Sequence, residues 1–171
     1  MNKAVFLDRD GTINVEKNYL HKIEDFEFLP GVIEGLSLLN NAGYKLIIVT
    51  NQSGIGRGYY TENDFITLNN WMLDVLKSNG IIISKVYYCP HLPDAKVEKY
   101  RMDCECRKPK LGMYNQAIRD CAICEKTDCR GFLIANNEKP EIIEDVKNDK
   151  YKRVNYQSCL LDCAKYIINQ N

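Results

Sequence analysis

Short runs of consecutive apolar residues alternate along this chain with stretches in which apolar residues recur at helical spacing. The apolar runs predict buried strands at residues 4–8, 45–50, 84–88, 132–136 and 152–155. The helical spacing predicts helices at residues 31–42, between Thr61 and Gly80, and at 113–123, 139–148 and 158–169. Because strands and helices alternate throughout, we expect an α/β fold: a three-layer sandwich around a mostly parallel, Rossmann-type central sheet.

Two of the predicted helices carry clear end signals. Pro30 opens the helix at 31–42, and Gly43 closes it. Thr61 has the position of an N-cap and Asp64 the position that a capping box fills, while Gly80 ends that helix. The apolar residues of this second helix are expected in the core: Phe65, Leu68, Met72 and Leu76.

Length and charge set limits on the kind of protein. With 171 residues, of which 45% are hydrophobic, the chain is long enough for one core, and we expect a single domain over residues 1–171. The 23 basic and 23 acidic residues cancel, which argues against a general nucleic-acid or membrane-surface binder. No apolar run approaches the length of a membrane span, and the first strand leaves no room for a signal peptide, so we expect a cytoplasmic protein.

Two carboxylates follow the first apolar run directly. Asp8 and Asp10 come at the end of the predicted strand, before Gly11 and Thr12. A carboxylate at the carboxyl edge of a parallel sheet can be a nucleophile that takes a phosphoryl group, with a second carboxylate acting as acid and base. Strand alternation would point the two side chains to opposite faces, so the chain must bend at Gly11 for both to serve one site. The alternative is a plain turn, since Asp-Gly is a common turn signal.

The second strand also ends in polar residues, Thr50-Asn51-Gln52-Ser53. The Thr50 hydroxyl, beside the backbone amides of Asn51 and Gln52, can hold a phosphoryl oxygen. Every second residue from 54 to 58 is a glycine, which permits a substrate to approach the backbone closely. Arg57, between two of these glycines, can reach an anionic substrate. Alone, this segment would also fit a polar loop with turn glycines.

The chain has eight cysteines. Three of them and a histidine form two close pairs of potential metal ligands, Cys89-x-His91 and Cys104-x-Cys106. Three thiolates and one imidazole complete a tetrahedral zinc site with no open position, so the metal would be structural. The segment between the pairs is charged and has few apolar residues, and a zinc-stapled loop over residues 89–106 would explain how it stays ordered. For Cys121 and Cys124 we favour core packing over a second metal site.

A basic cluster comes directly after the zinc ligands. Lys108, fixed beside a metal-ordered loop, can neutralise charge on both a phosphate and an aspartate nucleophile. Arg107, with its planar guanidinium, suits a second phosphate or sugar oxygens. As a bare charge cluster, residues 107–110 would be a solvated turn.

Taken together, these motifs resemble those of the haloacid dehalogenase superfamily. Within it they are similar to the D-glycero-D-manno-heptose 1,7-bisphosphate phosphatases and to their kin, the histidinol-phosphate phosphatases. The resemblance rests on the segments 6–12, 50–54, 89–106 and 107–109, taken in order. It covers residues 4 to about 113 and includes Tyr19, His21 and the segment 26–28.

The resemblance implies a Mg²⁺-dependent phosphatase that removes the 7-phosphate of the heptose bisphosphate through an aspartyl phosphate. The reaction would belong to nucleotide-activated heptose biosynthesis, which supplies lipopolysaccharide precursors. Asp8 would be the nucleophile and Asp10 the general acid and base, while Thr50 and Lys108 would stabilise the phosphoryl group. Mg²⁺ would bind the Asp8 side chain and the Asp10 backbone carbonyl. The implied substrate contacts are Tyr19, Asn51, Gln52, Ser53, Arg57 and Arg107.

The resemblance also implies the surroundings of the site. No large cap domain is expected, so the zinc loop and the 14–22 segment would shape the pocket. We expect a monomer that acts on a small phosphorylated sugar and has no nucleic-acid or membrane partner.

The chain departs from the family's fourth motif, a strand that ends in Gly-Asp and whose aspartate completes the Mg²⁺ shell. Here the segment 134–139 holds neither glycine nor aspartate. Aligning back from Lys147 puts Glu138 at the aspartate position, whereas aligning from the strand puts Asn136 there. We favour Glu138, because asparagine offers an oxygen but no charge and should bind Mg²⁺ more weakly.

Three alternatives stay open. The altered fourth motif would fit a homologue with little hydrolytic power, although Asp8, Asp10, Thr50 and Lys108 are present. Histidinol phosphate is the nearest rival substrate, and we favour the heptose bisphosphate because the many donors suit a polyhydroxylated, twice-charged sugar. A nucleic-acid binder or end-phosphatase is disfavoured by zero net charge and by few aromatics near the basic cluster.

Overall fold

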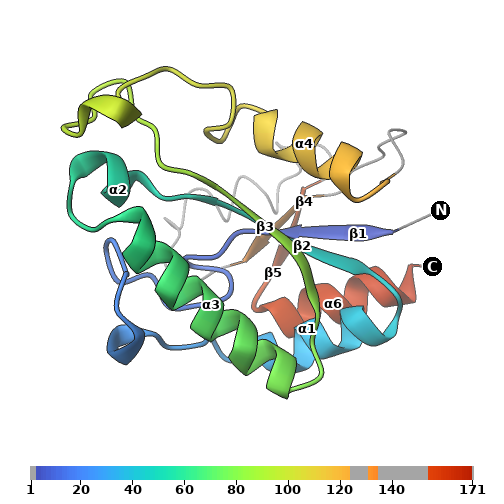
Figure 1. Cartoon of the computed structure of the whole chain (residues 1–171). Helices are drawn as coiled ribbons and strands as arrows, with labels where there is room; N and C mark the ends of the chain where they lie inside the picture. Colours follow the sequence, from blue (N-terminus) through green and yellow to red (C-terminus); the bar gives the residue numbers. More distant parts are fainter. Residues whose placement is uncertain (1–2, 124–130, 135–153, 171) are drawn as a thin grey trace.

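The computed structural model describes residues 3–123, 131–134 and 154–170 (Figure 1). The strands are β1 (Ala4–Leu7), β2 (Lys45–Asn51), β3 (Ile83–Cys89), β4 (Gly131–Ile134) and β5 (Val154–Gln157). They pair in parallel, in the order β1-β2-β3 in one sheet and β4-β5 in another. The predicted parallel strands are therefore confirmed.

Helices cover both faces of the strands. They are α1 (Val32–Asn41), α2 (Ser53–Arg57), α3 (Glu62–Ser78), α4 (Gly112–Asp120) and α6 (Leu160–Asn169), with short 3₁₀ helices η1 (Ile23–Asp25) and η2 (Glu98–Tyr100). In Figure 1, α1 and α6 lie below the strands and α4 lies above them, which gives the three layers that the sequence predicts. None of the helices in the described part of the chain is both long and apolar enough to cross a bilayer.

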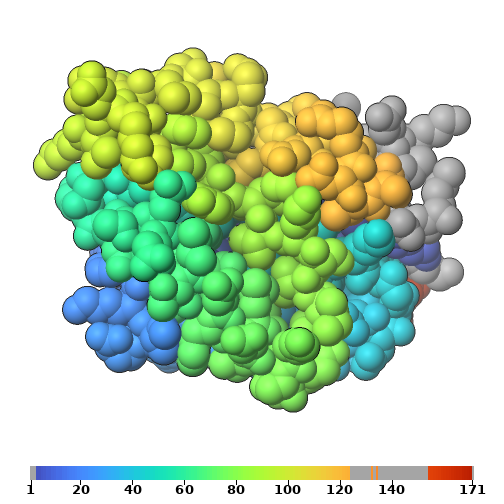
Figure 2. Space-filling model, in the orientation of Figure 1, coloured from blue at the N-terminus to red at the C-terminus, as the bar shows by residue number. Residues whose placement is uncertain are grey.

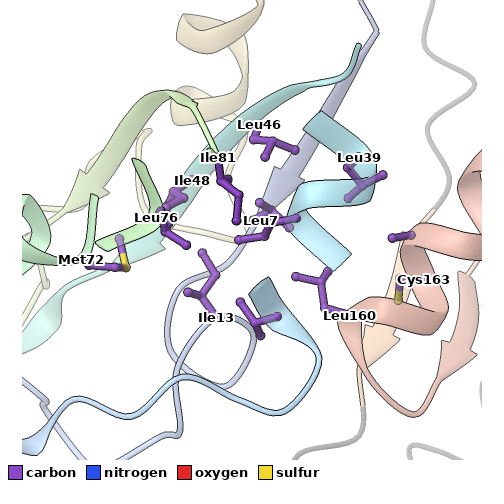
Figure 3. Packing of buried hydrophobic residues seen from close by; sticks show 13 residues of the cluster. Leu7, Ile13, Leu39, Leu46, Ile48, Met72, Leu76, Ile81, Leu160 and Cys163 are labelled. Atoms are coloured by element: carbon purple, nitrogen blue, oxygen red, sulfur yellow. The ribbon is translucent and has the colours of Figure 1, made fainter. Parts of the chain in front are cut away.

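β2 is buried on both faces, as expected of a central parallel strand. Leu46 and Ile48 point into the cluster that α1, α3 and α6 complete (Figure 3). The intervening residues Ile47 and Val49 point to the other face, where α4 contributes Met113. The period-two alternation of one strand thus fills both layers of the core.

α3 begins with the predicted capping box. Thr61 Oγ1 accepts the N–H of Asp64 at 3.1 Å, and the Asp64 carboxylate accepts the N–H of Thr61 at 2.7 Å. All four residues that were assigned to the core are buried: Phe65, Leu68, Met72 and Leu76. The helix ends before Gly80, whose φ of 74° is left-handed.

The segment between β3 and α4 packs on α2 and α3. Leu92, Ala95 and Tyr100 of this segment are buried in one apolar cluster with Ile55 and Phe65. Figure 2 shows the yellow-green segment lying against the teal one that contains α2. The loop is therefore anchored by apolar contacts to neighbouring helices, which its own charged composition did not predict.

Some predicted boundaries differ from the structure. α4 ends at Asp120 rather than at 123, because Ala122 has a left-handed φ of 50°. β5 extends to Gln157, where the strand was expected to end at 155. Residues Ser53–Arg57 form α2, a short helix that was not predicted from the sequence. The predicted helix at 139–148 and Cys124 lie outside the described residues.

Candidate active site

The chain turns sharply after β1, and this turn positions both aspartates. Asp8 follows the last residue of β1. The carbonyl of Arg9 then accepts the N–H of Asn14 at 3.2 Å. Gly11 in this turn has a φ of 76°, which residues with a side chain rarely adopt. The predicted bend at Gly11 is therefore present, directly after Asp10.

Asp8 is paired with Lys108 from the far side of the zinc loop. Lys108 Nζ donates to Asp8 Oδ2 at 2.5 Å, while the Asp8 side chain stays 43% exposed. Asn51 holds the Lys108 backbone: its Oδ1 accepts the Lys108 N–H at 3.0 Å and its Nδ2 donates to the Lys108 carbonyl at 3.2 Å. An accessible carboxylate beside a fixed ammonium is suited to attack phosphorus, because the cation offsets the repulsion between two anions.

Asp10 is held by a buried arginine from its own turn. Arg9 is 1% exposed and donates Nε and Nη2 to Asp10 Oδ1 at 3.2 and 2.9 Å. Asn14 Nδ2 donates to the same oxygen at 3.0 Å. The guanidinium also lies over the Phe65 ring, 5.4 Å from its centroid. Arg9 was assigned no role from the sequence, although its place between the two aspartates was an available signal.

Gln52 joins Asp10 to Thr50. Its Nε2 donates to Asp10 Oδ2 and to Thr50 Oγ1, both at 2.9 Å. The Tyr60 hydroxyl donates to Gln52 Oε1 at 2.5 Å. Gln52 and Asn51 were both predicted as substrate contacts, and the structure shows that the side chains of both bind other parts of the protein. Tyr60 was missed because its role depends on the fold rather than on a motif.

A cavity of about 140 Å³ opens beside Asp10. Its lining is mostly polar and consists of Asp10, Glu16, Asn18, Tyr19, Leu20, Asn51, Gln52, Ser53 and Tyr60. Burial and the neighbouring Asp10 raise the pKa of Glu16. The cavity therefore offers hydroxyls, amides and carboxylates to a bound molecule, and no lysine or arginine is among its lining residues.

The two predicted arginines do not line this cavity, whereas the other four predicted substrate contacts do: Tyr19, Asn51, Gln52 and Ser53. Arg57 has its Nε buried without a partner among the described residues. Arg107 Nη1 donates to the carbonyl of His91 at 3.4 Å, which places it against the zinc loop.

The four predicted zinc ligands come together in the fold. The ligand atoms of Cys89, His91, Cys104 and Cys106 all lie within 4.8 Å of one another. Cys106 Sγ is 3.1 Å from Cys104 Sγ, 3.3 Å from Cys89 Sγ and 3.5 Å from His91 Nδ1. Ligands of a tetrahedral zinc ion stand about 3.5–3.8 Å apart, so these separations suit one ion with little adjustment. The three cysteines form no disulfide, and the closed ligand set fits a structural metal.

The cysteine–histidine cluster shares its backbone supports with Asn51, Gln52 and Lys108. Cys89 is the partner of Asn51 in the β2–β3 ladder, and the Gln52 N–H donates to the Cys89 carbonyl at 2.8 Å. On the other side of the cluster, Cys106 is followed after one residue by Lys108. A metal at the cluster would therefore fix the chain segments that carry Asn51, Gln52 and Lys108.

Asp8 supplies the oxygen ligands that Mg²⁺ requires. Among the described residues its Oδ1 accepts a single hydrogen bond, from the backbone N–H of Arg9 at 2.8 Å, and the carboxylate is open to solvent. The Asp10 carboxylate already accepts five hydrogen bonds, which leaves its backbone carbonyl for an ion. These residues fit the predicted Mg²⁺ site, while Glu138 and Asn136 lie outside the described residues.

Comparison with known proteins agrees with this geometry. A family model described as polynucleotide kinase 3 phosphatase matches residues 3–138. The D-glycero-beta-D-manno-heptose-1,7-bisphosphate 7-phosphatase of Pasteurella multocida is 42% identical over 168 residues, and the match covers 91% of each chain. The chain belongs to the haloacid dehalogenase-like phosphatases. The resemblance predicted from its motifs is confirmed.

Other members of this phosphatase family match over different lengths. The heptose bisphosphate phosphatase of Haemophilus influenzae is 50% identical over 123 residues, which is 72% of this chain and 66% of that relative. The matched region thus spans just under two thirds of that relative. A structure of D,D-heptose 1,7-bisphosphate phosphatase from B. bronchiseptica, complexed with magnesium and phosphate, has a TM-score of 0.79 over 99% of both chains at 22% identity. This last likeness shows that the phosphatase fold is shared.

Proposed function

We propose that this phosphatase removes the 7-phosphate of D-glycero-D-manno-heptose 1,7-bisphosphate through an aspartyl phosphate. The observation that carries the proposal is the accessible Asp8 carboxylate paired with Lys108 Nζ at the end of the parallel strands. Relatives that are 42–51% identical are named for this activity.

The chemistry follows from the positions of the two aspartates. A carboxylate oxygen of Asp8 attacks phosphorus, and the bond between phosphorus and the sugar oxygen breaks with its electron pair on that oxygen. Asp10 lines the cavity in which the leaving sugar would lie, so it is placed to give this oxygen a proton. Asp10 then takes a proton from water, the water oxygen bonds to phosphorus, and Asp8 leaves as a carboxylate.

Charge on the phosphoryl oxygens is balanced by Lys108 and by the Thr50 hydroxyl. Asp8 and the Asp10 carbonyl would hold Mg²⁺, which when bound adds positive charge beside the phosphoryl group. Asn51 keeps the Lys108 backbone in place, which limits the rearrangement needed on binding.

The cavity supports a polyhydroxylated leaving group. The hydroxyls of Tyr19 and Ser53 can exchange hydrogen bonds with a sugar, and Glu16 can accept from sugar hydroxyls. A second phosphate would not fit beside Glu16 and Asp10, since both are acidic. We propose that it lies outside the cavity, within reach of Arg107.

Phosphate release from three substrates tests this function. The heptose bisphosphate, histidinol phosphate and a 3′-phosphorylated oligonucleotide would be compared in the presence of Mg²⁺, with Asp8→Asn as the inactive control. We expect the highest kcat/KM for the heptose bisphosphate and a fall of at least about 10³-fold for Asp8→Asn with an unchanged melting temperature. A higher value for either other substrate would replace the proposed one. Equal phosphate release by both proteins would instead favour a homologue with little hydrolytic power.

Histidinol phosphate is the second candidate because of the acidic character of the cavity. Glu16 and Asp10 both line it, and an ammonium group would be attracted to the pair. The kcat/KM values for the heptose bisphosphate and histidinol phosphate separate the two candidates directly, and the Glu16→Gln variant provides a second test. This variant should lower kcat/KM for the amine substrate more than for the sugar.

We further propose a monomer in a reducing compartment, without nucleic-acid or membrane partners. A reducing compartment keeps the thiolates of Cys89, Cys104 and Cys106 available for metal, and all three are free in the structure. The zero net charge supports the absence of polyanionic partners.

A further inference from the structure

The side chain of Gln52 is almost completely enclosed by groups that form the active site. It is 2% exposed and contacts Asp10, Thr50, Tyr60 and Arg9. A glutamine in contact with substrate would need a free donor or acceptor. Here both amide protons and the amide oxygen are already used inside the protein.

The surroundings leave one orientation for the Gln52 amide. Its oxygen faces two donors, the Tyr60 hydroxyl at 2.5 Å and Arg9 Nη2 at 3.5 Å. Its nitrogen faces two acceptors, Asp10 Oδ2 and Thr50 Oγ1. Exchanging nitrogen and oxygen would set the amide oxygen against the Asp10 carboxylate and the amide nitrogen against the guanidinium, so the reverse orientation is excluded.

This fixed orientation determines what the Thr50 hydroxyl can do. The Thr50 oxygen accepts a hydrogen bond from Gln52 Nε2, so the hydroxyl's own proton must point away from Gln52. Among the described residues, the Thr50 hydroxyl donates to no protein acceptor. Its donor is therefore left for a group that arrives with the substrate.

We propose that Gln52 is a positioning residue that turns the Thr50 hydroxyl into a donor aimed at the phosphoryl group, and that Tyr60 keeps the Gln52 amide in this orientation. The inference rests on the proposed phosphatase function and gives Gln52 a different role from substrate binding. The same amide holds Asp10, so the acid and base of the reaction and the phosphoryl-binding hydroxyl are oriented by one side chain. Burial raises the pKa of Tyr60, in keeping with a hydroxyl that only donates.

A double-mutant cycle between Gln52 and Thr50 tests the proposal. Gln52→Met keeps the length of the side chain and removes its hydrogen bonds, and Thr50→Val removes the hydroxyl. Gln52→Met should lower kcat by about 10- to 100-fold while KM changes by less than about threefold, because the lost interaction is needed at the transition state. In the Thr50→Val background, the fall in kcat caused by Gln52→Met should be at least about fivefold smaller, since there is no hydroxyl left to orient.

p-Nitrophenyl phosphate separates the Thr50 effect from the Asp10 effect. Its leaving group departs without a proton, so the first step, measured as the burst of p-nitrophenolate, does not need Asp10, and a loss caused only by displaced Asp10 should disappear from the burst rate. We expect the Gln52→Met loss and its coupling to Thr50→Val to persist. Losses that simply multiply, or a loss that vanishes with the aryl phosphate, would overturn the proposal. A wild-type protein inactive on both substrates would instead overturn the proposed function and this inference with it.

Two tyrosines provide a matched control. Tyr60→Phe removes the donor to Gln52 Oε1 and should lower kcat about three- to tenfold. Tyr88→Phe removes a hydroxyl that donates to Glu62 at 2.9 Å on α3, and kcat should stay unchanged. An equal loss of kcat in both variants would show that the effect of Tyr60 is only structural and would contradict its proposed role.

Discussion

Removing the metal from the cysteine–histidine cluster should destabilise the protein by a calculable amount. The Sγ atoms of Cys104 and Cys106 lie 3.1 Å apart. At an effective dielectric constant of about 20, two thiolates at this distance repel by about 5 kcal/mol. Without a cation at least one thiolate must therefore take up a proton or move away, and the loop loses its fixed geometry.

The size of the effect follows from metal binding to the folded state alone. Free zinc at 100 to 1,000 times the dissociation constant stabilises the fold by about 2.7–4.1 kcal/mol. For a chain of this size each 1 kcal/mol shifts Tm by about 2–4 °C, so chelation should lower Tm by about 5–16 °C. Leu92 and Tyr100 remain as apolar anchors, so we expect the loop to loosen without unfolding of the whole chain.

Thermal melts, metal analysis and thiol titration would measure this together. The purified protein should contain about one zinc, and a strong chelator should lower Tm and expose the three cluster thiols. Cys106→Ser should reproduce the shift, whereas Cys159→Ser should change Tm little, because Cys159 is the N-cap of α6 and serine is a favourable N-cap. A metal-free protein that melts at the same temperature with and without zinc would refute the reasoning.

Three further predictions concern other parts of the molecule. Leu68→Ala should lower the free energy of unfolding in urea by about 2–5 kcal/mol, because Leu68 is fully buried and its truncation leaves a cavity. Asn51→Leu should lower kcat by about tenfold or more in phosphate release with a loss of only about 1–2 kcal/mol in stability, since it frees the Lys108 backbone. Hydrogen bonds from Tyr100 and then Tyr88 lower the pKa of Glu62, so its stabilisation should be present above the unfolded-state pKa near 4.5 and be lost as pH falls through the folded value. Glu62→Gln should therefore flatten the acid side of a plot of unfolding free energy against pH, and an unchanged slope would argue against it.

The strand ends and the metal cluster could be predicted from the sequence because each depends on short-range spacing. Apolar runs that stop at Asp8 and Thr50 place both residues at one edge of a parallel sheet without further information. The spacing of the Cys and His pairs specifies the zinc ligands in the same way. The convergence of the two aspartates also required a bend at Gly11, and the left-handed φ of Gly11 in the structure shows this bend.

The hydrogen-bonding roles could not be predicted, because they depend on which side chains meet in three dimensions. The motif predicts Gln52 as a substrate contact. Its hydrogen bonds with Tyr60 and Arg9 can be seen only in the folded structure. α2 is five residues long, too short for helical periodicity to show. The apolar anchoring of the zinc loop was missed for a related reason, since Leu92 and Tyr100 find their partners on distant helices.

The two-point attachment of the zinc loop has a consequence for how the protein can change. The ligand pairs close the loop at its base, and Leu92, Ala95 and Tyr100 pack it on the helices, so the exposed residues 93–94, 96 and 98–99 form a tip with little influence on Asp8 or Lys108. Insertions or replacements in this tip would be tolerated far better than changes at its base. Selection, or a designer's library, can therefore vary the exposed surface of this loop while the residues around Asp8 and Lys108 stay unchanged.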